Sequence, residues 1–145
     1  MIVKIKKLSE NAKLPTYGSE DSAGADLYAL LEESIEIKPH ETFFVHTGIS
    51  VEIPEGYCGL VFARSSMGAK RGLAPANKVG VIDADYRGEI MVTLHNHSEK
   101  VAEVEPYERI AQLAIVPFLK AEFEEAEELS DTVRGAGGFG STGTK

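Results

Sequence analysis

The feature that most limits what this chain can fold into is the even spread of its chain-breaking residues. Fourteen Gly and six Pro residues cut the whole length into short segments. Several segments are rich in β-branched and aromatic residues, and turn signals lie between them in place of long amphipathic patterns. The candidate strands are residues 2–6, 42–53, 57–63, 90–94 and 110–118. This pattern predicts an all-β sandwich, barrel or jelly roll rather than alternating strands and helices.

Residues 121–129 fit this pattern least well. Their sequence, AEFEEAEEL, consists of helix formers and favours a helix by propensity. The same charges also suit an edge strand, because charged side chains keep a strand edge from pairing with other chains. Helix and edge strand therefore both stay open for this segment.

The chain is long enough for one domain with a real core, and it shows no internal repeat or linker. We expect a β-barrel domain over residues 1–133, followed by a Gly-rich segment over residues 134–145. Five of these last twelve residues are Gly. Such a segment is either an unstructured terminus or a flexible arm that orders over a ligand, with backbone amides close to phosphate.

The formal net charge of −8 argues against unaided binding to a nucleic-acid backbone. A small anion stays possible where a few cations and backbone amides converge. The sequence has no apolar run that could span a membrane, its start is too charged for a secretory signal, and Cys58 is its single cysteine. These features predict a cytoplasmic protein without a nucleic-acid or membrane partner.

Two short segments carry candidate site residues. Asp26 lies within the apolar run AGADLYA, where a buried carboxylate needs a hydrogen-bond donor or a hydrated metal. Its alternative role is to cap a turn. Arg64 stands beside Ser65 and Ser66 after an apolar strand, a combination that suits a phosphate cradle, although an ordinary polar loop explains it equally well.

Three further segments complete the set. Residues 77–90, NKVGVIDADYRGEI, resemble a hairpin with a crowded polar turn. A carboxylate near an aromatic ring suits water activation beside a sugar or base, whereas a surface salt-bridge network is the alternative. Gln112 lies in an apolar strand and needs hydrogen-bond partners if it is buried. In the tail, Phe139 stands among glycines and is suited to stack on a base.

Taken in this order, the five segments resemble the five motifs of the trimeric deoxyuridine triphosphatase family, from about residue 23 to residue 143. AGADLYA, ANKVGVIDADYRGEI, ERIAQL and RGAGGFGSTG are near-complete matches. The second motif departs from the family pattern. Ala63 stands where a Pro is usual and Met67 where a Leu is usual, while Arg64 and Ser65 remain. We expect a looser backbone before the phosphate cradle, with its donors in place.

The resemblance implies a distorted jelly-roll or β-barrel subunit with a flexible Gly-rich arm. It implies hydrolysis of dUTP to dUMP and pyrophosphate, which keeps uracil out of DNA and supplies dUMP for thymidylate synthesis. Water attacks the α-phosphorus in line, and Asp83 matches the acid that activates it. Mg²⁺ is the implied cofactor, held by the substrate phosphates without a direct protein ligand, with Asp26 reaching it through water.

The resemblance also implies a homotrimer with sites at subunit interfaces, each completed by the tail of another subunit. Tyr86 matches the residue whose ring packs on the deoxyribose. The implied substrate-binding residues are Asn77, Gly80, Val81, Ile82 and Tyr86 for uracil and sugar, Arg64, Ser65, Ser66 and Gln112 for phosphates, and Arg134, Phe139, Gly140, Ser141 and Thr142 for the closing arm.

Two alternatives stay open. A deoxycytidine triphosphate deaminase would share the fold, although such chains tend to be longer and need an extra acid. A catalytically silent nucleotide-binding or regulatory module would keep the fold without turnover. The complete Gly-rich tail and the hairpin sequence DADY at residues 83–86 favour the triphosphatase over the deaminase. The intact Asp83, Arg64 and Phe139 argue against a silent module.

Overall fold

The computed structural model describes residues 1–138 and confirms the all-β class. The described part contains one helical turn, η1 (Ser66–Lys70), and otherwise strands and loops. The strands are β1 (Lys4–Lys7), β2 (Thr16–Tyr17), β3 (Ala25–Tyr28), β4 (Ile35–Ile37), β5 (Thr42–His46), β6 (Ile49–Glu52), β7 (Tyr57–Phe62), β8 (Leu73–Pro75), β9 (Gly80–Ile82), β10 (Met91–Asn96), β11 (Ala102–Val104) and β12 (Arg109–Pro117). The predicted strands at 2–6, 57–63, 90–94 and 110–118 correspond to β1, β7, β10 and β12 within two residues at each end.

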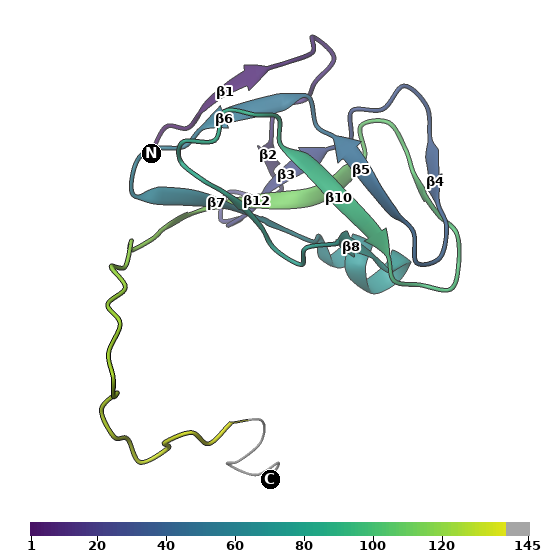
Figure 1. Ribbon diagram of the computed structural model, residues 1–145. Helices are drawn as coiled ribbons and strands as arrows, with labels where there is room; N and C mark the ends of the chain where they lie inside the picture. The colour runs from purple at the N-terminus through teal and green to yellow at the C-terminus, as the bar shows by residue number, and fades with distance from the viewer. Residues whose placement is uncertain (139–145) are drawn as a thin grey trace.

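The strands form several small antiparallel sheets around one core, as in a jelly-roll-like subunit (Figure 1). The largest sheet has the order β2-β3-β12-β7-β9. A second has the order β5-β10-β8, and the pairs β1-β6 and β11-β4 complete the described part. Strands far apart in the sequence are therefore neighbours in space, and this is what brings the candidate motifs together.

The long strand β12 lies at the centre of the largest sheet and aligns three motifs. Gln112 of β12 pairs with Asp26 of β3 on one side and with Phe62 of β7 on the other. A register shift between Arg109 and Ala111 marks a bulge at the start of β12. Bulges redirect side chains at strand ends, and this one lies beside a candidate site residue.

The core is built from alternating apolar positions of the strands. In β10, Val92 and Leu94 are buried while the residues between them are less so, as expected for a strand with one face on the core. In β3, Ala25, Asp26 and Leu27 are all buried, so this strand is covered on both faces. The carboxylate of Asp26 is therefore held inside the fold, where it requires partners.

The prediction of one continuous strand over residues 42–53 is wrong. The segment divides into β5 and β6, which belong to different sheets, and turns a corner at Gly48. Gly48 has a φ of 68°, and a Cβ there would lie 2.6 Å from Leu30 Cδ2 and 2.8 Å from Ala12 Cβ. Only glycine accommodates both the left-handed conformation and the close contacts.

The prediction of a hairpin over residues 77–90 also needs correction. β9 pairs with β7, whereas β10 pairs with β5 and β8, so the segment crosses from one sheet to another. The polar turn between the two strands is present, with the Tyr86 N–H donating to the Asp83 carbonyl oxygen over 3.1 Å. The strands that pair with β9 and β10 are distant from them in the sequence, so the local pattern did not predict this pairing.

Residues 121–129 form neither a helix nor a strand. They lie in the segment after β12, which leaves the sheets and runs away from them in Figure 1. Phe123 is 95% exposed and Leu129 is 88% exposed. An isolated helix this short is unstable in water without tertiary packing, and the many Glu side chains repel one another. Within residues 1–138, no helix has the length and apolar character needed to cross a membrane.

Candidate active site

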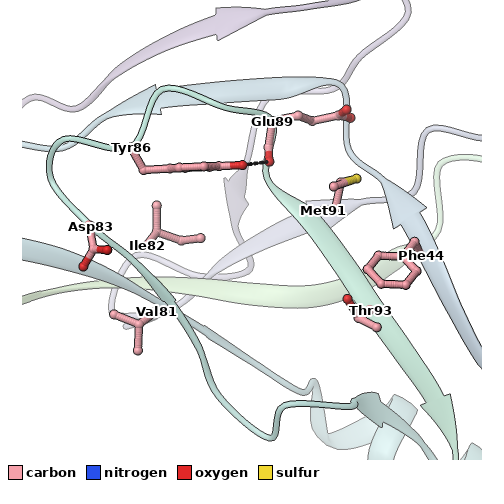
Figure 2. Close-up of a pocket in the computed structure, with 8 residues that line it drawn as sticks. All are labelled: Phe44, Val81, Ile82, Asp83, Tyr86, Glu89, Met91 and Thr93. Atoms are coloured by element: carbon pink, nitrogen blue, oxygen red, sulfur yellow. Dashed lines mark hydrogen bonds between the residues drawn. The ribbon is translucent and has the colours of Figure 1, made fainter.

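The turn between β9 and β10 borders a hollow of about 260 Å³ (Figure 2). We call it the Asp83 hollow. Its lining residues are Phe44, Val81, Ile82, Asp83, Tyr86, Glu89, Met91 and Thr93. Apolar walls with a few polar groups are typical of ligand sites, although this hollow is smaller than the roughly 300–1,000 Å³ of complete small-molecule pockets. It suits one part of a ligand, such as a ring and a sugar.

The Tyr86 ring is held in place at the edge of this hollow. Its hydroxyl donates a hydrogen bond to the Glu89 carbonyl oxygen over 2.9 Å, drawn as a dashed line in Figure 2. A Cβ on Gly88 would lie 2.3 Å from the Tyr86 hydroxyl oxygen, so the ring occupies the space that a side chain at position 88 would take. The glycine is therefore required for this position of the ring.

Asp83 follows directly after β9 and is exposed to solvent. β9 is the last strand of its sheet in the described part, so its outer edge offers backbone groups that no neighbouring strand pairs. Of the residues predicted to bind uracil and sugar, Val81, Ile82 and Tyr86 line the hollow with Asp83. Asn77 and Gly80 do not line it. A Cβ on Gly80 would contact the Asn77 side-chain nitrogen at 3.4 Å, so these two residues adjoin each other at the start of β9.

Glu89 is ionised more readily than an ordinary glutamate. Burial of the carboxyl works against ionisation, but hydrogen bonds from His46 and from the Gly48 backbone N–H outweigh it, and the pKa of Glu89 lies below its usual 4.5. The distances are 2.8 Å from His46 Nδ1 to Oε2 and 2.7 Å from the Gly48 nitrogen to Oε1. A fixed negative charge thus stands at the wall of the Asp83 hollow.

A second hollow, of about 340 Å³, collects residues of three other motifs. We call it the Arg64 hollow. Its lining residues are Gly18, Ser22, Ala23, Gly24, Asp26, Arg64, Ser65, Arg109 and Gln112. It lies where β3 and β12 are paired, next to the end of β7. The central position of β12 explains why these segments meet.

Asp26 holds two arginines at this hollow. Arg64 Nε donates to Asp26 Oδ1 over 2.6 Å, and Arg109 Nη1 donates to Asp26 Oδ2 over 3.1 Å. Two guanidinium groups on one carboxylate leave one net positive charge. Guanidinium groups bind phosphate oxygens through several N–H donors, so the cluster suits an anion.

Neighbouring side chains orient this cluster. Arg64 Nη1 donates to Ser66 Oγ over 3.3 Å, and Gln112 Nε2 donates to the Ala63 carbonyl oxygen over 2.9 Å. A proline at position 63 would provide the same carbonyl acceptor, so the substitution of Ala63 for the family's usual proline preserves this bond. A Cβ on Gly24 would lie 2.8 Å from Gln112 Oε1, so the close approach of β3 to Gln112 requires a glycine there.

The structure thus places eight of the predicted residues in two hollows that share no lining residue: Val81, Ile82, Asp83 and Tyr86 in one, and Asp26, Arg64, Ser65 and Gln112 in the other. Ser66, Asn77 and Gly80 line neither. Arg134 lines neither, and its Nε donates instead to the Gly137 carbonyl oxygen over 2.8 Å. Phe139, Gly140, Ser141 and Thr142 lie outside the described residues.

Several residues of both hollows were not predicted from the sequence. Arg109 lies in the motif ERIAQL, from which the sequence argument used only Gln112. The position of this arginine within a motif could have identified it as a candidate. Phe44, Met91 and Thr93 come from β5 and β10, outside the motif segments, and only the pairing of these strands brings them to the Asp83 hollow.

The fold and the two hollows define an all-β protein that can hold a ring at one place and an anion at another, with a carboxylate beside the ring. Comparison with known proteins specifies this class further. The sequence pattern of the dUTPase family matches residues 10–143. The chain is 49% identical over 143 residues to the deoxyuridine 5'-triphosphate nucleotidohydrolase of Nautilia profundicola, covering 99% of each chain. It is 48% identical to that of a Hydrogenobaculum species over the full length of both chains.

Solved structures agree with this result. The dUTPase of Staphylococcus bacteriophage 80alpha with dUpNHpp superposes with a TM-score of 0.89 at 32% identity, covering 98% of each chain. A point mutant of the dUTPase from phage phi11 of S. aureus superposes with a TM-score of 0.80 at 26% identity, covering 90% of this chain and 100% of that chain, and its structure reveals the coordination of a structural Mg(II) ion. The chain belongs to the dUTPase family.

Proposed function

We propose that this chain hydrolyses dUTP to dUMP and pyrophosphate by in-line attack of an activated water on the α-phosphorus. The observation that carries the proposal is the placement of Asp83 and Tyr86 in one hollow, beside an unpaired strand edge of the described chain. A carboxylate next to a bound sugar can orient a water and accept its proton. Phosphoryl transfer requires little more from a protein than positioning and charge stabilisation.

In this proposal, the backbone of β9 reads uracil and the Tyr86 ring packs on the deoxyribose. A ribose 2′-hydroxyl would meet the ring or lose its hydrogen-bond partners, so UTP would be disfavoured. Arg64, Arg109 and Ser65 bind the phosphates, and Gln112 keeps the strand before Arg64 in register through its bond to Ala63.

Mg²⁺ fits the residues present when the substrate phosphates provide its ligands. No cluster of three or more His, Cys, Asp or Glu side chains within residues 1–138 is arranged to hold a metal. Both oxygens of Asp26 already accept hydrogen bonds from arginines, and their remaining lone pairs can accept bonds from metal-bound water. The ion would neutralise charge on the phosphate oxygens. The Mg(II) of the phi11 relative supports a divalent cation in this family.

The separation of the two hollows supports sites that combine residues of different subunits, and the resemblance to the trimeric family makes the proposed assembly a homotrimer. The Asp83 hollow of one subunit would face the Arg64 hollow of another. Residues 134–145 would act as a closing arm, with Arg134, Ser141 and Thr142 on phosphate and Phe139 on uracil. Cytoplasm remains the predicted location.

Release of pyrophosphate from dUTP, with and without Mg²⁺, tests the proposal, and dCTP, dTTP and UTP serve as controls. We expect Mg²⁺-stimulated release that is selective for dUTP. Ammonia released from dCTP would identify a deaminase instead, and tight dUTP binding without turnover would identify a silent binding module.

A further inference from the structure

Glu89 connects the Tyr86 ring to a part of the fold outside the five motifs. Its carbonyl oxygen accepts the hydrogen bond of the Tyr86 hydroxyl. Its carboxylate accepts one hydrogen bond from His46 Nδ1 and another from the Gly48 N–H. Glu89 thus holds the Tyr86 ring through its backbone carbonyl group. The corner between β5 and β6 in turn holds the Glu89 side chain.

The same corner binds the residues on both sides of Glu89. Ser50 Oγ donates to the Arg87 carbonyl oxygen over 2.7 Å, and the Ile90 N–H donates to the Ile49 carbonyl oxygen over 2.9 Å. Between Arg87 and Ile90, the hydrogen bonds of the Glu89 carboxylate to His46 and Gly48 are the side-chain contacts that hold residue 89. The Glu89 carbonyl oxygen belongs to the same peptide group as the Ile90 N–H, so the bond to Ile49 fixes the plane of this group, and the carboxylate bonds hold residue 89 at a second point.

His46 contacts the Glu89 carboxylate from outside the Asp83 hollow. Its side chain is 57% exposed and lines a hollow of about 590 Å³ that is distinct from the Asp83 hollow. Glu89 is the one residue that lines both. The Glu89 side chain is 22% exposed, so loss of its imidazole partner would leave the carboxylate of a partly buried side chain without that bond.

We propose that His46 and Glu89 are positioning residues that hold the Tyr86 ring where it packs on the deoxyribose and excludes the ribose 2′-hydroxyl. His46 does not touch the substrate and acts through Glu89. The inference rests on the proposed function, because it assigns the pair a role in selecting deoxyribose. A purely structural pair would affect the free energy of unfolding without affecting sugar selectivity.

Three variants test the pair by steady-state kinetics with dUTP and UTP. His46→Ala removes the donor, His46→Asn keeps an N–H near the position of Nδ1, and Glu89→Gln removes the charge. We expect His46→Ala and Glu89→Gln to lower the ratio of kcat/KM for dUTP over UTP by about fivefold or more, through KM for dUTP, with kcat changed less than about twofold. His46→Asn should restore most of the ratio.

The pair His40–Glu99 provides a matched control. Its atoms are 3.2 Å apart and its side chains are 61% and 84% exposed, away from both the Asp83 and Arg64 hollows. Glu99→Ala breaks this pair and should leave the dUTP-to-UTP ratio unchanged. If His46→Ala lowers the melting temperature while keeping the wild-type ratio, the pair is structural and the proposal is wrong.

A second measurement does not depend on hydrolysis. In protein labelled with 3-fluorotyrosine, the ¹⁹F resonance of Tyr86 is assigned by its loss in Tyr86→Phe. We expect this resonance to shift or broaden in His46→Ala and Glu89→Gln but not in Glu99→Ala. An unchanged Tyr86 resonance would overturn the positioning role. Absence of dUTP hydrolysis by the wild type would instead overturn the proposed function, with the resonance still deciding the role of the pair.

Discussion

Arg64 Nε donates a hydrogen bond to Asp26 Oδ1 over 2.6 Å, joining residues from two motifs that are 38 positions apart in the chain. Asp26 is 6% exposed and also binds Arg109. The carboxylate keeps two guanidinium groups close together, so the cluster has a net positive charge. A single arginine paired with Asp26 would be neutral overall. In the proposed function, this positive charge would attract the polyphosphate of the substrate.

Replacement of Asp26 by Asn tests this role. The variant should lose about 1–3 kcal/mol of unfolding free energy, because the two arginines lose the charge that holds them. KM for dUTP should rise roughly tenfold, since the arginines no longer share a fixed position. Chemical denaturation and initial-rate kinetics measure the two effects. A lower stability with an unchanged KM would show that the cluster only supports the fold.

Asp83→Asn should lower kcat by about 10²- to 10⁴-fold, because the amide cannot accept a proton from water. Asp83 is exposed at the end of β9, so the fold should be unaffected. Affinity for dUpNHpp, measured by calorimetry, should stay near that of the wild type. Turnover that survives the substitution would exclude Asp83 as the base.

Gly88→Ala should impair activity without unfolding the protein. The new Cβ would stand 2.3 Å from the Tyr86 hydroxyl oxygen, and the ring can turn away from it. We expect kcat/KM for dUTP to fall about tenfold with a nearly unchanged melting temperature. Gly68→Ala is the control, because the nearest atom to its Cβ would be 3.9 Å away. Wild-type kinetics in Gly88→Ala would show that the ring position does not matter.

The ionisation of Glu89 predicts a pH-dependent contribution to stability. Its pKa is lower in the folded chain than its ordinary value of 4.5, so the stabilisation is fully present above that value and is lost as the pH falls through the folded-state pKa. Glu89→Gln should be less stable than the wild type at pH 7, and the difference should shrink in acid. Denaturant titrations between about pH 3 and pH 7 measure this.

Removal of residues 134–145 should abolish dUTP hydrolysis and leave the fold intact. Within residues 1–138 the last strand ends at Pro117, and Arg134 lines neither hollow. Thermal unfolding of the shortened protein should therefore match that of the full chain, and its state of assembly can be measured by light scattering. Hydrolysis at the full rate would contradict a closing arm.

Local patterns predicted the strands that have strong alternation or many β-branched residues, to within two residues for β1, β7, β10 and β12, but they did not predict which strands pair. The short strands β4, β8 and β11 have three residues each, too few for a periodic signal. Gly48 was a visible break in the 42–53 segment, yet its left-handed conformation follows from the packing of Leu30 and Ala12 around it. The helix propensity of residues 121–129 had no effect, because no surface within the described chain covers them.

The sequence by itself determined the all-β class, the approximate positions of four of its strands, and the motif segments that supply the candidate site residues. These depend on residue type and short spacing, which are local properties. Only the tertiary structure decided that Asp26, Arg64 and Arg109 share one hollow, that Glu89 links Tyr86 to His46, and that Asp83 lies in a different hollow from the arginines. Antiparallel pairing joins residues far apart in the chain, and its register depends on how all the strands cover one core rather than on any segment alone.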